Sequence, residues 1–498
     1  MRHPTAILSE SIGVPESGLR LLLTILLAYP VAAGFRWLYA NNNNNHSQNP
    51  ERSKEDFAQS VGARNRYILI SGLALATFFN GTAVCHSLIT VAVSYGICAV
   101  FQHQRTLAVA GVWILNAVYL LGGYYVMAAD DYDISWTMTQ CILCLRLMGF
   151  SMDYMDGTTA AATNKTMNSS QDRPLSFSAN TALTILPSFT KVAAYCFYPS
   201  AFLVGPQFSF SLYQEWLMFD DLHGAASHTK SIQQYSYVKK CAAWGVFYLA
   251  MQQLIGAHYP TSYLLSSDYA ALSFLHRLGV FWLVGKFVFT KYLGVWLLTE
   301  GATALFGIGY EGQMQDGQHS FAGLANVNPL KYETATSIED IIGSFNINTN
   351  LWSKYYVFKR LRWMESKTAS QTGTLAFLAI WHGFHYGYFT TFLMEFLDLK
   401  AEGILRKWVY ILLPSLSSAS SATNQQHNGW MSWIKNVLAW CVCSSTLFYA
   451  GVGFDLLSLS SSWVAYRQIY FVGHISLFTL LGSSFLLPRP PIKKNKIN

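Results

Sequence analysis

The residues best suited to chemistry lie in Trp381-His382-Gly383-Phe384-His385-Tyr386-Gly387-Tyr388. This stretch belongs to an apolar run, Leu375 to Phe396, that is long enough to cross a bilayer. Hydrocarbon has no water to solvate an imidazole, so a histidine there needs a protein partner or an aqueous cavity. His382 and His385 would share one face of a helix formed by this run. An imidazole with a pKa of about 6.5 could accept a proton from a hydroxyl group.

Upstream of these histidines, Asn346 lies in a polar, uncharged string from Ser344 to Asn350. An amide side chain can donate to an oxygen that develops negative charge, or it can orient a hydroxyl or an imidazole. Non-catalytic interpretations stay open. A membrane histidine can be a packing residue bonded to a carbonyl, which is the default for His385. An Asn-rich string also suits turns and helix caps.

Composition favours a membrane protein. Of the 498 residues 52% are hydrophobic and 12% are charged, about half the charged share of a soluble protein. The net charge of +7 indicates cytoplasmic loops rich in Lys and Arg rather than nucleic-acid binding. The pair Cys141 and Cys144 lacks a second cysteine pair with zinc-site spacing, so we predict no metal site.

The apolar blocks predict an all-α, polytopic integral membrane protein with about ten or eleven transmembrane or re-entrant helices. A polar N-terminal tail covers 1–18, a single membrane domain 19–487 and a basic tail 488–498, with the candidate site in 341–397. The turn-prone Asn80-Gly81 should interrupt the run Tyr67 to Phe101. Pro199 and Gly205-Pro206 should break the run Leu186 to Phe210.

Charged residues inside apolar runs should be buried against protein or face a cavity. Arg146 and Asp153 form one such pair, and Lys286 and Lys291 are two further cases. The sequons at Asn164 and Asn168 could be glycosylated only if their loop is luminal.

A basic amphipathic segment, Trp352 to Met364, separates Asn346 from His382. It suits a membrane interface, where its cations either mark the cytosolic side or attract an anionic cofactor such as coenzyme A. The residues that we expect to meet such an anion are Lys359, Arg360 and Arg362.

Several spaced motifs resemble the membrane-bound O-acyltransferase family. Trp381-His382-Gly383-x3-Gly387-Tyr388-x3-Phe392 is similar to the signature around that family's active histidine, and Tyr449-x4-Phe454 and Tyr466-x3-Tyr470-Phe471-x2-His474 resemble two later motifs. The string 344–350, the run 202–208 and Thr299-Glu300-Gly301 look like the branch called lysophospholipid acyltransferase 5 or lysophosphatidylcholine acyltransferase 3. The likeness covers about 65–490, and it departs from some members in having no Trp-Asp pair upstream of the histidine.

The resemblance implies an acyl-CoA-dependent lysophospholipid O-acyltransferase (EC 2.3.1.-) that re-acylates a free glycerol hydroxyl in phospholipid remodelling. His382 would be the general base and Asn346 the orienting or oxyanion group, with direct transfer and no acyl-enzyme. Trp381, His385, Tyr388, Lys359, Arg360 and Arg362 would bind substrate.

The implied partners are acyl-CoA, a lysophospholipid and the lipid bilayer, but no nucleic acid. Lysophosphatidylcholine is the first candidate acceptor, and lysophosphatidylethanolamine and lysophosphatidylserine are further ones. Acyl-CoA would be a co-substrate, with no permanently bound cofactor. A homodimer is left open.

The expected location is the endoplasmic reticulum membrane, because Lys494 and Lys496 resemble a dilysine retrieval signal. Two alternatives remain: a same-family enzyme acting on a sterol, diacylglycerol or a protein, and a transporter. A transporter would favour an internal repeat with paired broken helices, and the two halves of this sequence show no convincing similarity.

Overall fold

The computed structural model describes residues 4–13, 15–39, 54–127, 134–163, 175–177, 181–218, 228–412 and 429–487. Helices dominate these ranges, and the named strands there, β1 (Gly312–Gln313) and β2 (His319–Ser320), form one antiparallel hairpin. The sequons at Asn164 and Asn168 and the basic tail 488–498 lie outside the described residues.

The chain forms two compact units. The first unit comprises Met1–Ile255, Thr290–Pro329 and Gly343–Phe384. The second comprises Gly256–Phe289, Leu330–Ile342 and His385–Asn498. The single membrane domain expected over 19–487 stays a prediction.

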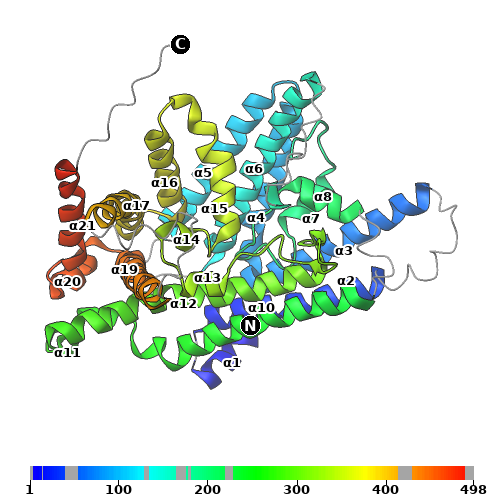
Figure 1. Ribbon diagram of the computed structural model, residues 1–498. Helices are drawn as coiled ribbons and strands as arrows, with labels where there is room; N and C mark the ends of the chain where they lie inside the picture. Colours follow the sequence, from blue (N-terminus) through cyan, green and yellow to red (C-terminus); the bar gives the residue numbers. More distant parts are fainter. Residues whose placement is uncertain are drawn as a thin grey trace, which may run out of the picture. The chain divides into compact units, whose positions relative to one another are not determined.

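Long and short helices together build the first unit (Figure 1). In chain order they are α1 (Pro4–Ile12), α2 (Glu16–Tyr39), α3 (Lys54–Asn80), α4 (Val84–Val100), α5 (Arg105–Val126), α6 (Trp136–Thr163), α7 (Phe189–Cys196), α8 (Phe210–Met218), α10 (His228–Leu254), α15 (Ile347–Ser353) and α16 (Lys367–His382). Part of the predicted polar tail, 1–18, is therefore helical in α1 and the start of α2.

The second unit contains shorter helices beside two long ones. They are α11 (Ser267–Ala270), α13 (Pro329–Glu333), α14 (Ile338–Ile342), α17 (Tyr386–Leu412), α19 (Gly429–Leu456), α20 (Leu459–Gln468) and α21 (Val472–Gly482). Helix α12 (Phe274–Phe306) contributes its first half to this unit and its second half to the first unit.

Within the part of the chain that the structure describes, five helical stretches are long and apolar enough to cross a membrane, and six if one bent pair counts as a span. They are Glu16–Tyr39, Phe57–Val100, Arg105–Val126, Phe274–Phe306 and Trp433–Leu456, with Leu459–Gln468 and Val472–Leu486 as the pair bent by 87°. Large apolar side chains face outward on these helices, for example Ile114 (64% exposed), as contact with lipid requires. The predicted all-α, polytopic membrane fold is confirmed. The expected number of about ten or eleven helices is higher than this number of spans because it also included shorter and broken helices.

The predicted breaks occur where the turn residues stand. A 3-10 turn, Gly81–Ala83, interrupts the run that Asn80-Gly81 was expected to divide. Between α7 and α8 the chain is irregular, as the prolines predict. The Arg146 guanidinium donates there to the carbonyls of Tyr195 and Ala201, both at 2.8 Å. The buried, charged group thus satisfies backbone oxygens that a broken helix leaves without partners.

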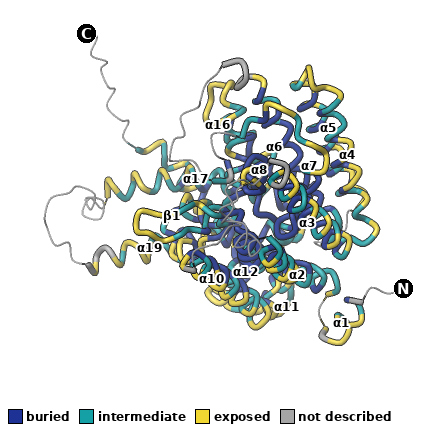
Figure 2. The backbone as a smooth tube through the Cα atoms, turned by 90° about the vertical axis from the view of Figure 1, so that its right-hand side faces the viewer, coloured by how far each residue is buried: buried dark blue, intermediate teal, exposed yellow. Residues whose placement is uncertain are grey.

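Each unit has an aromatic core. In the first, the rings of Phe35 and Trp216 stack with centroids 5.2 Å apart, and Figure 2 shows buried backbone gathered along α6 and α7. In the second, the Tyr466 hydroxyl donates to the Tyr449 carbonyl at 3.0 Å. The Tyr449 hydroxyl lies 2.6 Å from Nδ1 of His474, so the two C-terminal motifs meet as one cluster.

Candidate active site

The backbone around Asn346 is held in place on both sides. The Asn328 amide donates to the Ser344 carbonyl at 2.7 Å, and the Ile347 amide donates to the Asn326 carbonyl at 3.1 Å. Asn346 itself is left-handed, with φ of 46° and ψ of 37°, immediately before α15. Asparagine tolerates this conformation better than most residues. Both the backbone and the amide chemistry therefore favour Asn at this position.

A buried carboxylate binds the backbone that holds this loop in place. Glu300 is 3% exposed, and its Oε2 accepts from the backbone amides of Asn326 (2.7 Å) and Val327 (3.2 Å). Its Oε1 accepts from the hydroxyl of Tyr237 at 2.6 Å. The side chain of Asn326 in turn accepts from the backbone amide of Asn348 at 3.1 Å. A chain of hydrogen bonds thus runs from Glu300 to the residue two places after Asn346.

The signal for this support in the sequence was weak. Glu300 stood out solely as part of the Thr299-Glu300-Gly301 likeness, although a carboxylate at the end of an apolar run could have identified it. Asn326 and Asn348 resembled ordinary polar loop residues. The structure shows that they fix the loop that carries the candidate amide.

His382 is the last residue of α16, and the helix end beside it is anchored. The Trp381 indole donates to the Cys141 carbonyl at 2.9 Å, and the Tyr124 hydroxyl donates to the Trp381 carbonyl at 3.0 Å. The rings of Trp381 and His382 meet edge to face with centroids 4.7 Å apart. Helices α5 and α6 therefore hold the half-buried histidine through its neighbour.

The predicted span Leu375 to Phe396 is not one helix. Gly383 has φ of 125° and ends α16, and α17 begins only at Tyr386. That φ suits glycine and few other residues. His385 lies in the connection between the two helices, so His382 and His385 do not share a helical face. The prediction of a shared face was wrong because the glycine ends the helix between them.

Asn346 and His382 lie toward the same end of a helical pair. Helices α15 and α16 lie side by side and run in opposite directions (Figure 1), with the rings of Trp352 and Phe377 stacked 5.7 Å apart. Asn346 precedes Trp352 by about 9 Å of helical rise, and His382 follows Phe377 by about 8 Å. Because the helices are antiparallel, both displacements point the same way.

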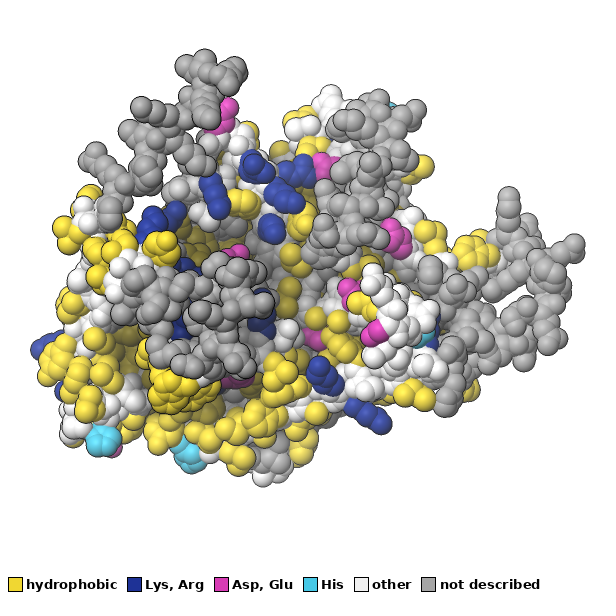
Figure 3. Space-filling view, in the orientation of Figure 1, with side chains coloured by type: hydrophobic (Ala, Val, Ile, Leu, Met, Phe, Trp, Pro, Cys, Tyr) yellow, Lys and Arg dark blue, Asp and Glu magenta, His cyan; other side chains and the backbone are white. Residues whose placement is uncertain are grey.

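The predicted basic segment contains two kinds of cation. The Arg360 guanidinium forms two hydrogen bonds with the carboxylate of Asp156, which raise the pKa of this arginine above its ordinary value. Lys359 and Arg362 are exposed, and the Lys359 ammonium lies 3.8 Å from the Tyr355 ring centroid. Figure 3 shows Lys and Arg side chains gathered in the upper part of the face in view.

The remaining predicted site residues belong to the second unit. The His385 and Tyr388 rings have centroids 5.8 Å apart, and Tyr388 also packs on Phe454 at 4.7 Å. A Cβ on Gly387 would lie 2.1 Å from the Gly453 carbonyl oxygen, so α17 and α19 approach closely there. The substrate-binding roles predicted for Trp381, His385, Tyr388, Lys359, Arg360 and Arg362 stay predictions.

Comparison with known proteins identifies the same family that the sequence motifs resemble. A profile of the MBOAT, membrane-bound O-acyltransferase family, matches residues 121–449. The chain is 34% identical to lysophospholipid acyltransferase 5 of Rattus norvegicus, over 97% of this chain and 90% of that protein. It is 32% identical to the Homo sapiens protein of that name, over 97% and 90%. Identity to the Drosophila melanogaster protein of that name is 34%, over 82% and 76%.

The Asn346 loop and the anchored His382 both lie inside the matched range, and the apolar helices suit a multi-pass membrane enzyme. The chain is therefore a membrane acyltransferase that belongs to the membrane-bound O-acyltransferase family.

Proposed function

We propose that this protein transfers an acyl group from acyl-CoA to the free glycerol hydroxyl of a lysophospholipid. The relatives' name, lysophospholipid acyltransferase, supports the acceptor class. Lysophosphatidylcholine is the first candidate, followed by lysophosphatidylethanolamine and lysophosphatidylserine. The observation that carries the mechanism is the position of Asn346 and His382 toward the same end of the antiparallel pair α15 and α16.

The reaction needs one proton acceptor and one donor to an oxyanion. His382 takes the hydroxyl proton while the glycerol oxygen attacks the thioester carbon, and the Asn346 amide donates to the resulting oxyanion. The carbon–sulfur bond then breaks, and the coenzyme A sulfur receives the proton from the imidazolium. A thioester is already activated, so direct transfer requires no acyl-enzyme.

The fixed surroundings of both residues support this assignment. The Asn346 backbone is hydrogen-bonded on either side, and the helix end before His382 is anchored through Trp381. Catalytic groups are effective when they are held in position before the substrate arrives. The exposed cations Lys359 and Arg362 would attract the phosphates of coenzyme A, and Arg360 would order the segment through Asp156.

The test is an acyl-transfer assay on purified protein, with a panel of lysophospholipids offered against several acyl-CoAs. Transfer to lysophospholipids that disappears in the His382→Ala protein supports the proposal. Transfer only to a sterol, diacylglycerol or a peptide would reject the acceptor, and no transfer to any acceptor would reject the function. The endoplasmic reticulum location and a homodimer stay predictions.

A further inference from the structure

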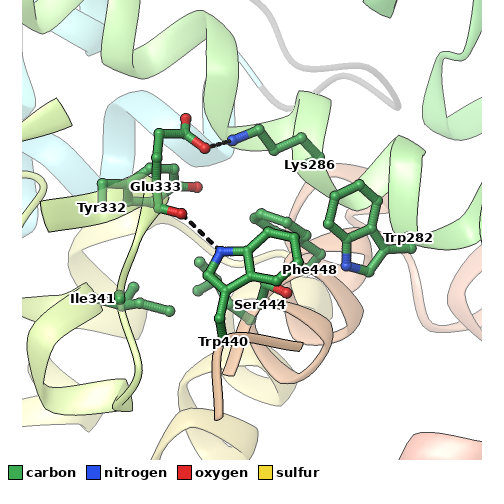
Figure 4. A pocket seen from close by; sticks show the side chains of 10 residues that line it. Trp282, Lys286, Tyr332, Glu333, Ile341, Trp440, Ser444 and Phe448 are labelled. Carbon is green, nitrogen blue, oxygen red and sulfur yellow. Dashed lines mark hydrogen bonds and ion pairs between the residues drawn. The ribbon is translucent and has the colours of Figure 1, made fainter. Parts of the chain in front are cut away.

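A cavity in the second unit is walled by aromatic rings. Its volume is about 70 Å³ and it lies between α12, α13 and α19, so it has room for a small group and not for a whole lipid. Trp282, Tyr332, Trp440 and Phe448 contribute rings to its wall (Figure 4). None of these residues has a role in the transfer reaction proposed above.

Three of the four rings meet at steep angles around Trp282, so they form a box and not a stack. The ring centroids of Trp282 and Phe448 are 5.1 Å apart, with 76° between the ring planes. Those of Trp282 and Trp440 are 6.3 Å apart, with 64° between the planes. The Trp440 indole donates to the backbone carbonyl of Glu333 at 2.7 Å, which fixes this wall. Ring faces carry negative electrostatic potential, and a box of them suits a cation.

The box already contains one positive and one negative group. The Lys286 ammonium and the Glu333 carboxylate form an ion pair, and Figure 4 shows the two side chains pointing toward each other. The ammonium lies 5.2 Å from the Tyr332 centroid and 5.6 Å from that of Phe448, within the distance of cation–π attraction. The expectation that Lys286 faces a cavity is confirmed.

We propose that this cavity binds a phosphocholine head group. Its trimethylammonium would lie among the rings beside Glu333, and its phosphate would pair with Lys286. A quaternary ammonium has no N–H to donate, so ring faces and a carboxylate are the groups suited to hold it. A zwitterion carries one charge of each sign. When the pair of Lys286 and Glu333 opens, the phosphate therefore replaces Glu333 as the partner of Lys286, and the trimethylammonium replaces Lys286 as the partner of Glu333.

This inference rests on the proposed function only for the source of the head group. The phosphocholine could belong to the lysophosphatidylcholine acceptor or to phosphatidylcholine of the bilayer. Binding itself needs no acyl transfer, so it can be measured separately. The opposing interpretation is that Glu333 merely neutralises Lys286 on an apolar helix and no head group enters.

The test uses two non-reactive probes that differ in one atom. Hexadecylphosphocholine carries the cation, and its 3,3-dimethylbutyl analogue replaces the quaternary nitrogen with carbon. Binding is measured by calorimetry on the full-length protein in detergent, for wild type and Trp282→Leu. The same substitution at Trp433, which is 60% exposed on α19 and does not line the cavity, is the matched control.

Wild type should bind the phosphocholine probe about 3- to 30-fold more tightly than the carbon analogue, as expected for a cation among aromatic rings. Trp282→Leu should reduce this preference, Trp282→Phe should restore part of it, and Trp433→Leu should leave it unchanged. Lys286→Met should weaken both probes, because both carry the phosphate. Equal binding of the two probes by wild type, or equal loss of both in Trp282→Leu, would overturn the proposal.

The source of the head group is then decided by kinetics. A raised KM for lysophosphatidylcholine in Trp282→Leu supports the site and assigns it to the acceptor. Weaker probe binding with an unchanged KM supports the site and assigns it to bilayer phosphatidylcholine. The probe measurements repeated in His382→Ala separate the two proposals, since that protein should bind normally without transferring. A protein that binds selectively yet never transfers would refute the function and leave this site standing.

Discussion

The Trp381 indole nitrogen donates a hydrogen bond to the carbonyl oxygen of Cys141, 2.9 Å away and 240 positions earlier in the chain. This bond fixes the end of α16 one residue before His382. A tryptophan next to the catalytic candidate is thus attached to α6 and not only to its own helix. Besides the substrate-binding role predicted for Trp381, this residue therefore positions the end of α16.

Replacing Trp381 with phenylalanine tests positioning. The change removes the indole donor and leaves the Cys141 carbonyl without this hydrogen bond. An unsatisfied buried carbonyl lowers the free energy of unfolding by about 1–3 kcal/mol. We expect kcat to fall while KM for both substrates changes little, because the histidine is displaced and the binding surfaces are kept. Trp363→Phe, at a position 76% exposed, is the control and should behave as wild type. A Trp381→Phe protein with raised KM and normal kcat would instead assign this residue to substrate binding.

The proposed catalytic pair predicts losses of different kinds. His382→Ala should lower turnover by about 10²–10⁴-fold, the usual contribution of a general base. Asn346→Gly should lower it by about 10²–10³-fold, because glycine accepts the left-handed backbone but offers no amide. Asn346→Asp should be equally impaired, since aspartate tolerates the left-handed backbone but its carboxylate cannot donate a hydrogen bond to the oxyanion. The double variant should be little worse than His382→Ala if both act on one transition state.

These measurements need membranes with matched protein levels. His385→Ala should retain more activity than His382→Ala, because support is its default role. A His382→Ala protein with more than about a tenth of wild-type turnover would remove the imidazole from the mechanism. Full activity in Asn346→Asp would reduce Asn346 to a conformational residue.

The two kinds of cation in the basic segment should respond differently. Lys359→Ala and Arg362→Ala should raise KM for acyl-CoA more than KM for the lysolipid, and the effect should shrink at high salt, because exposed charges are screened over about 8 Å at physiological ionic strength. Arg360→Ala should resemble Asp156→Asn in lowering protein yield or thermal stability, because each breaks the same pair. Equal changes in both KM values for Lys359→Ala and Arg362→Ala would favour a purely topological role.

The carboxylate beneath the candidate loop gives a further prediction. Glu300→Gln keeps the side-chain shape, but it removes the charge and replaces one of the two acceptor oxygens with an amide NH2, which cannot accept the hydrogen bonds made there. The backbone amides of Asn326 and Val327 should exchange hydrogen faster, and turnover should fall with little change in KM. Glu339→Gln, on the exposed side of α14, is the matched control. Unchanged exchange at 326 and 327 would mean that Glu300 does not order the loop.

The sequence determined the class of molecule and the identity of its candidate chemistry. Apolar blocks and few charges suffice for a polytopic helical fold, because lipid forces backbone groups to bond within helices. A histidine and an asparagine in spaced motifs were visible as residue types. The breaks at Asn80-Gly81 and around Pro199 followed from local backbone preferences, which need no knowledge of distant contacts.

Only the tertiary structure decided which residues support the candidate pair. The bonds from Glu300 to Asn326 and from Trp381 to Cys141 join positions far apart in the chain, and one sequence carries no information on such pairings. The same holds for the aromatic box around Lys286, whose walls come from three separate segments. The left-handed Asn346 and the helix end at Gly383 are local features, yet their meaning depends on the helices packed beside them. Residue types set what chemistry is available, and packing sets which groups meet.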